Sequence, residues 1–132
     1  MLKKSFKAYP LINFFLNKSS LTNVQIDSIL CGIEGQKRGI PEREWVKFRD
    51  GKEIKLGALM RSLGQGKTNL ISSLYTILFA QYIGLLPNEV MPVLIEGAQL
   101  ISQISGKKLT KREQKQIILK LNDIVCSLFP HM

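Results

Sequence analysis

The octapeptide LGQGKTNL, residues 63–70, contains Gly66-Lys67-Thr68, the closing residues of a nucleotide-binding P-loop. A P-loop also needs a glycine five residues before Gly66, where this chain has Arg61. It must follow a buried strand, whereas the apolar residues before this octapeptide have helical spacing. No carboxylate at the end of an apolar strand is placed to hold magnesium. We therefore predict that the chain hydrolyses no nucleotide.

Other catalytic groups are also scarce. The only histidine, His131, is the penultimate residue, so the usual base for a serine or cysteine nucleophile is missing. Cys31 and Cys126 lie far apart in apolar helical contexts without metal-ligand spacing, and we expect both to be reduced core residues. We predict that the protein is not an enzyme and needs no cofactor or metal.

Charge is unevenly distributed along the 132 residues, whose formal net charge is +9. Residues 36–67 contain nine Lys or Arg and four acidic residues, and residues 107–120 contain six basic residues and one acidic residue. Residues 69–106 contain two acidic residues and no basic one. Two basic regions flanking an uncharged stretch favour an anionic partner such as nucleic acid, or an acidic membrane surface.

Two segments have some features of targeting or membrane sequences. Residues 1–20 place lysines before an apolar patch, but Asn13 interrupts that patch and no small-residue cleavage site follows. We expect an N-terminal arm or short helix, begun by Pro10, that packs on the body. The uncharged residues 69–88 contain several hydroxyl and amide side chains, which favours a central buried helix over a membrane span. We expect a cytoplasmic protein.

Capping signals predict the first long helix and the last. Thr22 with Gln25 forms a capping box that begins a helix through Glu34, which Gly32 and Gly35 would end. A second box begins a helix over residues 110–128. Between them, residues 41–49 have the charge pattern of a short helix, and a hairpin across residues 46–56 is the alternative.

The middle of the chain predicts three further helices. They cover residues 53–63, residues 67–83, and a segment from Asn88 or Met91 to Gly106, with a turn at residues 64–66. We expect Ile29, Leu74, Leu78 and Leu121 to be buried. The sum is a single all-α domain, residues 1–132, forming a compact bundle of six or seven helices.

Residues 54–86 resemble the helix-turn-helix core of DNA-binding domains, particularly winged-helix domains. The resemblance lies in Leu63-Gly64 at the end of one helix, the Gln65-Gly66 turn, and Gly84-Leu85-Leu86 after the second helix. The second helix is longer and more apolar than a typical recognition helix, and residues 85–94 offer no wing. The resemblance implies that residues of the turn and first helical turns face the major groove or its phosphates: Gln65, Lys67, Thr68, Asn69, Ser72 and Ser73.

The start of the second predicted helix is also suited to binding phosphate. A helix beginning at Lys67 would offer free amides and a partial positive charge to a phosphate. Asn69 and Gln65 have the groups to read an adenine edge. The remaining candidate nucleic-acid contacts are basic residues of the preceding helix and of the loop after residue 35: Lys55, Arg61, Lys37 and Arg38.

Trp45 and Phe48, three residues apart, are expected to be core anchors, with stacking on bases as the alternative.

The leading hypothesis is a small protein that binds double-stranded DNA through a helix-turn-helix, as a transcriptional regulator does. The alternatives are a helical interaction or structural subunit of a nucleic-acid-handling complex, with a protein partner or homodimer through its apolar helices, and a membrane-surface protein.

Overall fold

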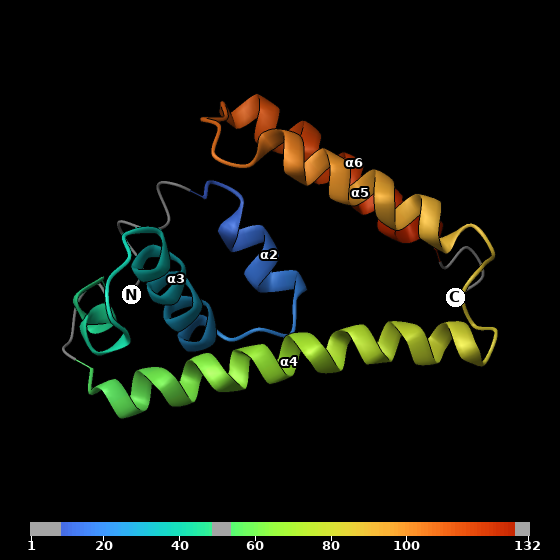
Figure 1. The fold of residues 1–132 in the computed structure, drawn as a ribbon. Coiled ribbons are helices and arrows are strands. Elements are labelled where there is room, and N and C mark those ends of the chain that lie inside the picture. Colours follow the sequence, from blue (N-terminus) through green and yellow to red (C-terminus); the bar gives the residue numbers. More distant parts are fainter. Residues whose placement is uncertain (1–8, 49–53, 129–132) are drawn as a thin grey trace. The chain divides into compact units, whose positions relative to one another are not determined.

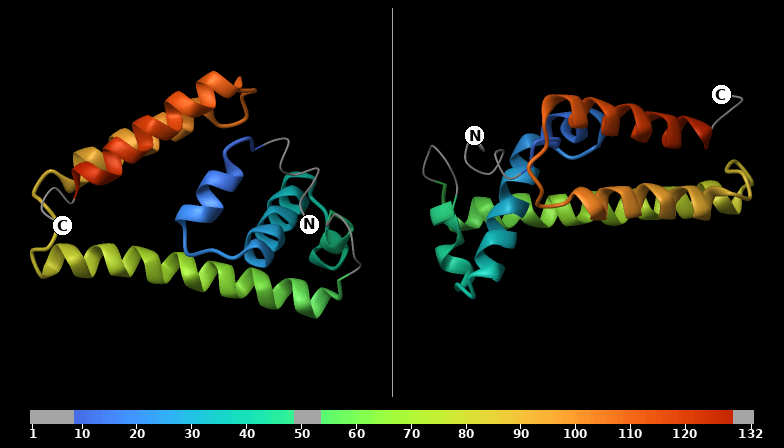
Figure 2. Two further views of the ribbon diagram at one scale, coloured as in Figure 1. Left: turned by 180° about the vertical axis from the view of Figure 1, so that it is seen from behind. Right: turned by 90° about the horizontal axis from the view of Figure 1, so that it is seen from above.

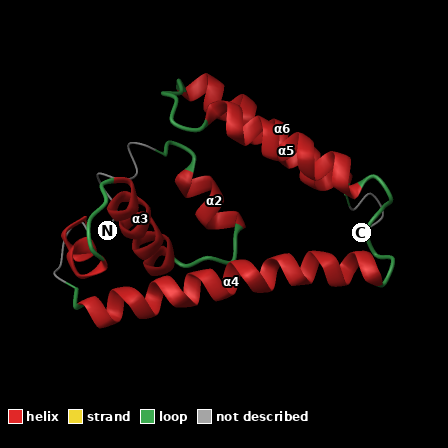
Figure 3. Ribbon diagram, viewed as in Figure 1, coloured by secondary structure: helices red, strands yellow, loops and turns green. Residues whose placement is uncertain are grey.

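The computed structural model describes residues 9–48 and 54–128, and all the regular structure in these ranges is helical (Figures 1 and 3). In chain order the helices are α2 (Ile12–Lys18), α3 (Asn23–Lys37), the 3-10 helix η1 (Glu42–Phe48), α4 (Leu56–Tyr82), α5 (Val90–Ile104) and α6 (Lys111–Ser127). The predicted all-α class, with about six helices, is confirmed.

The chain divides into two compact units. The first contains α2, α3, η1 and the part of α4 that ends at Leu74. The second contains the rest of α4 from Tyr75, together with α5, α6 and the residues just before Ile12. That the two units make one domain stays a prediction.

In the first unit, α3 begins as predicted and ends later than predicted. The Thr22 hydroxyl accepts a hydrogen bond from the Gln25 N–H (3.2 Å), and the Gln25 side chain accepts one from the Thr22 N–H (3.2 Å). The helix does not stop at Gly35 but continues to Lys37, and Gly39, with φ of 65°, turns the chain. The Ile40 N–H then donates to the Gly35 carbonyl (3.0 Å), which is the bond pattern of a Schellman motif.

Gly35 has a different function from ending the helix, because it makes room for an aromatic ring. The ring of Trp45 occupies the space where a Cβ of residue 35 would lie. Trp45 is buried, and its indole N–H donates to the Ile40 carbonyl (2.9 Å). The predicted anchor role of Trp45 is thus confirmed, and the ring packs in one core with Cys31, Leu59 and Leu63.

η1 decides between the two alternatives for the segment that contains Trp45. Residues 46–48 lie in a 3-10 helix and α4 has begun by Leu56, so neither segment forms a hairpin strand. The tip of the alternative hairpin, residues 49–53, lies outside the described residues, as does the start of the helix predicted from residue 53.

α4 is one uninterrupted helix through residues 64–66, and the turn predicted there is wrong (Figure 1). Neither Gly64 nor Gly66 has a positive φ, whereas Gly84, which follows the end of α4 as predicted, has φ of 77°. Each glycine costs an exposed helix only about 0.5–1 kcal/mol relative to alanine. Burial of Leu59 and Leu63 on the same helix outweighs that cost.

In the second unit, α5 and α6 run alongside each other, as both views of Figure 2 show. The second predicted capping box is present: the Thr110 hydroxyl accepts from the Glu113 N–H (3.1 Å), and the Glu113 carboxylate accepts from the Thr110 N–H (3.1 Å). Leu86, Val90 and Leu128 form the core of this unit. Cys126 is exposed, contrary to the expectation of a core residue, while Cys31 is buried.

The buried positions predicted from periodicity are only partly confirmed. Leu121 is buried and Ile29 is half-buried. Leu74 and Leu78, expected to be buried, are 64% and 63% exposed. No helix among the described residues is both long and apolar enough to cross a membrane.

Candidate functional site

Lys67 and Thr68 lie in the interior of α4. Their backbone N–H groups are therefore within the helical hydrogen-bond ladder and do not form a free helix N-terminus. The predicted grip on a phosphate by helix-terminal amides at Lys67 is wrong. Both side chains remain exposed, as does that of Gln65, so Lys67 can still contact an anion through its ammonium group.

Gly66 has a packing role in place of the predicted turn. It is buried, and a Cβ added to it would lie 2.9 Å from Ile29 Cδ1 and 3.4 Å from Gln25 Cβ. The absence of a side chain therefore lets α3 approach α4 closely at this point. Gly64, two residues earlier, is exposed, and a Cβ added there would have no neighbouring atom within 4 Å.

The side-chain amide of Asn69, predicted to read a base edge, is hydrogen-bonded to other residues of the chain. Its Nδ2 donates to the Ser20 carbonyl (2.8 Å) and to Gln25 Oε1 (3.3 Å), and its Oδ1 accepts from Ser20 Oγ (2.7 Å). These bonds attach α4 to the loop before α3 and to the first turn of α3. A base contact by Asn69 would require the amide to leave these partners.

The two predicted serines also lie on the continuous helix. The Ser73 hydroxyl donates to the Asn69 carbonyl one turn earlier (2.9 Å), a common arrangement for serine within a helix. Ser72 is exposed. The structure thus brings Gln65, Thr68 and Ser72 onto the surface of one helix, without the turn that would direct them into a groove.

Arg38 forms two contacts within its own unit. Its Nε lies 2.7 Å from Glu34 Oε1, and its guanidinium carbon lies 4.9 Å from the centre of the Phe48 ring.

A second ion pair joins Lys47 and Glu44 at 2.9 Å, and the hydrogen bond from Lys47 lowers the pKa of the Glu44 carboxyl. Both pairs are exposed, so they orient these side chains more than they stabilise the fold.

The other predicted cations are solvent-exposed: Lys37, Lys55, Arg61 and Lys67. Within the described ranges none of these four forms an ion pair. The first unit therefore presents cations that remain available to an anionic partner.

A feature that the sequence reasoning missed is an exposed apolar surface on α4, here called the apolar face of α4. It consists of Ile71, Leu74, Tyr75, Leu78, Phe79 and Tyr82, which are 54%, 64%, 69%, 63%, 62% and 87% exposed. Helical geometry places these six within an arc of roughly 140°. Ala80, on the opposite side of the helix, packs against the core of the second unit. The signal for this face in the sequence is the uncharged stretch of residues 69–88, for which a buried helix is the prediction stated above.

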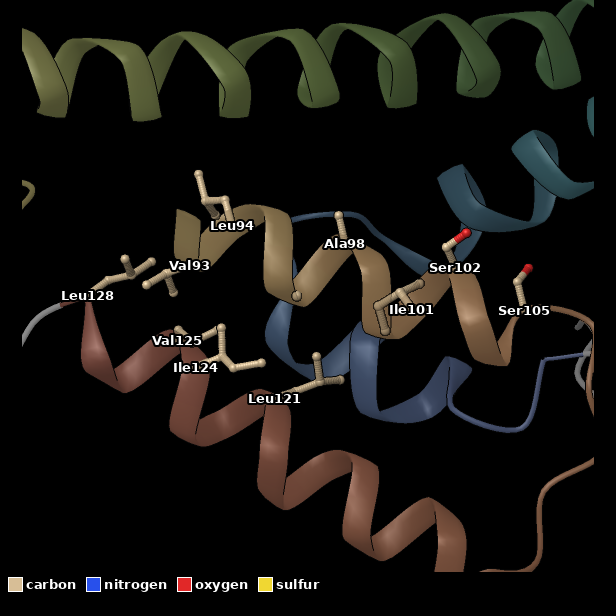
Figure 4. Close-up of a pocket in the computed structure, with 11 residues that line it drawn as sticks. Val93, Leu94, Ala98, Ile101, Ser102, Ser105, Leu121, Ile124, Val125 and Leu128 are labelled. Carbon is tan, nitrogen blue, oxygen red and sulfur yellow. The ribbon is translucent and has the colours of Figure 1, made fainter. Parts of the chain in front are cut away.

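The second unit has an apolar groove between α5 and α6, with a volume of about 530 Å³ (Figure 4). Ala98 and Ile101 line it from α5, and Leu121 and Ile124 from α6. Apart from two serines, the residues that line it have no polar side chain, so the groove is suited to an apolar side chain.

The described residues contain no group of three or more His, Cys, Asp or Glu side chains that would hold a metal ion. The geometry thus defines an all-α protein with two surfaces of different chemistry, one cationic and one apolar. No protein-family model, no curated protein and no solved structure matches this chain.

Proposed function

We propose that this protein is a helical interaction subunit that binds another protein surface through the apolar face of α4. The observation that carries the proposal is the exposure of six large apolar side chains on one helix, in a stretch without any charged residue. A helix without a charged face is normally covered, either by its own fold or by a partner. Exposed apolar patches of this size mark interaction sites.

Site-specific photo-crosslinking in the cells that make the protein tests this proposal. A photoreactive phenylalanine analogue at Tyr82, the most exposed of the six residues, should capture a protein partner. The same analogue at Leu119 of α6, which is 61% exposed but lies outside this face, is the matched control. Equal capture at both positions, or none at Tyr82, would contradict the proposal.

The distribution of charge supports a second candidate function, binding to the phosphates of double-stranded DNA. Residues 36–67 carry a net charge of +5, and four exposed cations there have no ion-pair partner within the described ranges. Because α4 has no turn at residues 64–66, we expect contacts to phosphates and not base reading. The two functions are compatible in a subunit of a nucleic-acid-handling complex.

Salt-dependent binding to duplex DNA tests this second function. If Lys67 contacts a phosphate, Lys67→Ala should weaken binding for all sequences and reduce the slope of log K against log salt by about one. Lys18→Ala, which removes an exposed lysine outside the basic segment, is the control with the same change in charge. Identical slopes for the parent and Lys67→Ala would remove Lys67 from the DNA contact.

A further inference from the structure

The apolar face of α4 contains a heptad-like seam. Ile71, Tyr75, Leu78 and Tyr82 follow one another at intervals of four, three and four residues, the alternation of d and a positions in a coiled coil. All four lie on one continuous helix, so helical geometry alone places them along one side. A seam of this kind fits a similar seam on another helix.

The area of this face is close to what a stable protein interface needs. Tyr75, Phe79 and Tyr82 are 69%, 62% and 87% exposed, and an aromatic side chain buries about 150–250 Å² when covered. These three alone therefore leave roughly 300–550 Å² uncovered. The three aliphatic residues of the face, each more than half exposed, bring it towards the roughly 800 Å² that each partner contributes to a standard interface.

The charge pattern favours a second copy of this chain over a membrane surface. Helices that lie on membranes carry Lys or Arg beside their apolar face, but no charged residue occurs between Lys67 and Glu89. Two chains of net charge +9 repel each other. The stretch 68–88 contains no charged residue, so pairing through it brings no like charges of the stretch together.

We propose, on the basis of the proposed function, that the partner of this face is a second copy of the chain, paired antiparallel across α4. In an antiparallel pair, a positions face d positions, so Tyr75 would lie opposite the second copy's Leu78, and Ile71 opposite its Tyr82. Each tyrosine ring of the seam then lies against an aliphatic side chain. Lys67 would lie level with the C-terminal end of the other helix, whose partial negative charge favours a cation.

The opposite orientation is less favourable for the same residues. A parallel pair would set Tyr82 against the second copy's Tyr82, and the two Lys67 ammonium groups level with each other. Like charges across a helical interface oppose pairing. The antiparallel register separates the two Lys67 ammonium groups. Both orientations have the two-fold symmetry that is commonest among homodimers, so the charge of Lys67 is what favours the antiparallel one.

Molar mass in solution provides the first test. The 132-residue chain should be a dimer by sedimentation equilibrium at about 100 µM. Leu78→Glu should weaken association at least 100-fold because it places a charge in the seam of both copies. Leu119→Glu makes the same change at a residue of similar exposure, 61% against 63%, and should leave the dimer intact. A monomeric parent, or equal dissociation of both variants, would overturn the proposal.

Disulfide trapping tests the orientation. In a background with exposed Cys126 replaced by serine, Ile71→Cys and Tyr82→Cys are prepared separately and then mixed. Antiparallel pairing predicts that the mixture forms a crosslinked dimer under mild oxidation and that neither variant does so alone. Crosslinking of each variant with itself, and none specific to the mixture, would overturn the antiparallel register.

The second-copy proposal and the proposed function fail in different ways. If the parent is monomeric while a photoreactive group at Tyr82 captures a different protein, the second-copy proposal is wrong and the proposed function stands. If the parent is monomeric and Tyr82 captures nothing, both are wrong. Capture of the same chain at Tyr82, with a dimer that Leu78→Glu dissociates, supports both.

Discussion

Replacing Gly35 by alanine should destabilise the protein, because the added methyl group would occupy the same space as the ring of Trp45. The ring is buried against α3 and is held by the hydrogen bond from its N–H to the Ile40 carbonyl. To admit a methyl group, either the indole must move or η1 must separate from α3. The close contact thus decides the sign of the effect.

The expected magnitude follows from two opposing effects. Overpacking of a well-packed core costs typically about 1–3 kcal/mol, and complete removal of a buried aromatic ring costs about 3–5 kcal/mol, which is the upper bound. Alanine in place of glycine returns up to about 1 kcal/mol through helix propensity. We expect a net loss of about 1–3 kcal/mol in the free energy of unfolding.

Gly64→Ala is the matched control for Gly35→Ala. It makes the same change in the interior of α4, where no atom lies within 4 Å of the new methyl group and φ is not positive. It should therefore stabilise the protein by about 0.5–1 kcal/mol. The two identical substitutions should have effects of opposite sign.

Urea unfolding followed by tryptophan fluorescence and circular dichroism measures both variants. Trp45 is the only tryptophan, so its emission reports directly on this contact, and a displaced indole should emit at longer wavelength. The cost of Gly35→Ala should also shrink when Trp45 is replaced by alanine, because the two positions are coupled. A Gly35→Ala variant as stable as its parent, with unchanged emission, would refute the reasoning.

Other consequences of the structure can be measured by the same unfolding assays. Asn69→Ala removes three hydrogen bonds to Ser20 and Gln25 and should lower the free energy of unfolding by about 1–2 kcal/mol. Thr68→Ala, at an exposed position of the same helix, should be near neutral. Equal effects of the two variants would contradict the attachment of α4 to the start of α3 through Asn69. Thr110→Ala removes the N-cap of α6 and should cost about 0.5–2 kcal/mol by urea unfolding. Hydrogen bonds from Thr110 lower the pKa of Glu113 below its usual 4.5. The ionised Glu113 carboxylate therefore contributes to the stability of the folded protein above that pH, and this contribution is lost as the pH falls below it. Glu113→Gln should remove this part of the acid sensitivity in a circular dichroism titration, and an unchanged titration would contradict the prediction.

The two capping boxes correctly predicted the starts of α3 and α6, whereas the helix start predicted at Lys67 is wrong. Thr22 and Thr110 each cap a helix through bonds to residues only three positions away, so the sequence contains all the groups involved. The roles predicted for two glycines are wrong. Gly35 and Gly66 were assigned to a helix end and a turn, but both are required by contacts with Trp45 and α3, which are distant in sequence.

Helical periodicity has a similar limit. It predicted that Leu74 and Leu78 are buried, but both are exposed, because periodicity does not say what covers an apolar face. The same pattern describes Leu121, which is buried, and Leu78, which is exposed. The candidate nucleic-acid contacts from Gln65 to Ser73 lie on α4, where the predicted helix start at Lys67 is wrong, and the exposed apolar surface that follows them was not predicted.

The side-chain oxygen of Gln25 accepts two hydrogen bonds, one from the Thr22 N–H and one from Asn69 Nδ2. The first closes the start of α3, and the second ties that start to α4. Because one atom accepts both bonds, we expect fraying of the first turn of α3 and loss of its bond to Asn69 of α4 to be coupled. In hydrogen exchange, the Thr22 amide and the Asn69 side-chain amide should accordingly lose protection together, with the same dependence on denaturant.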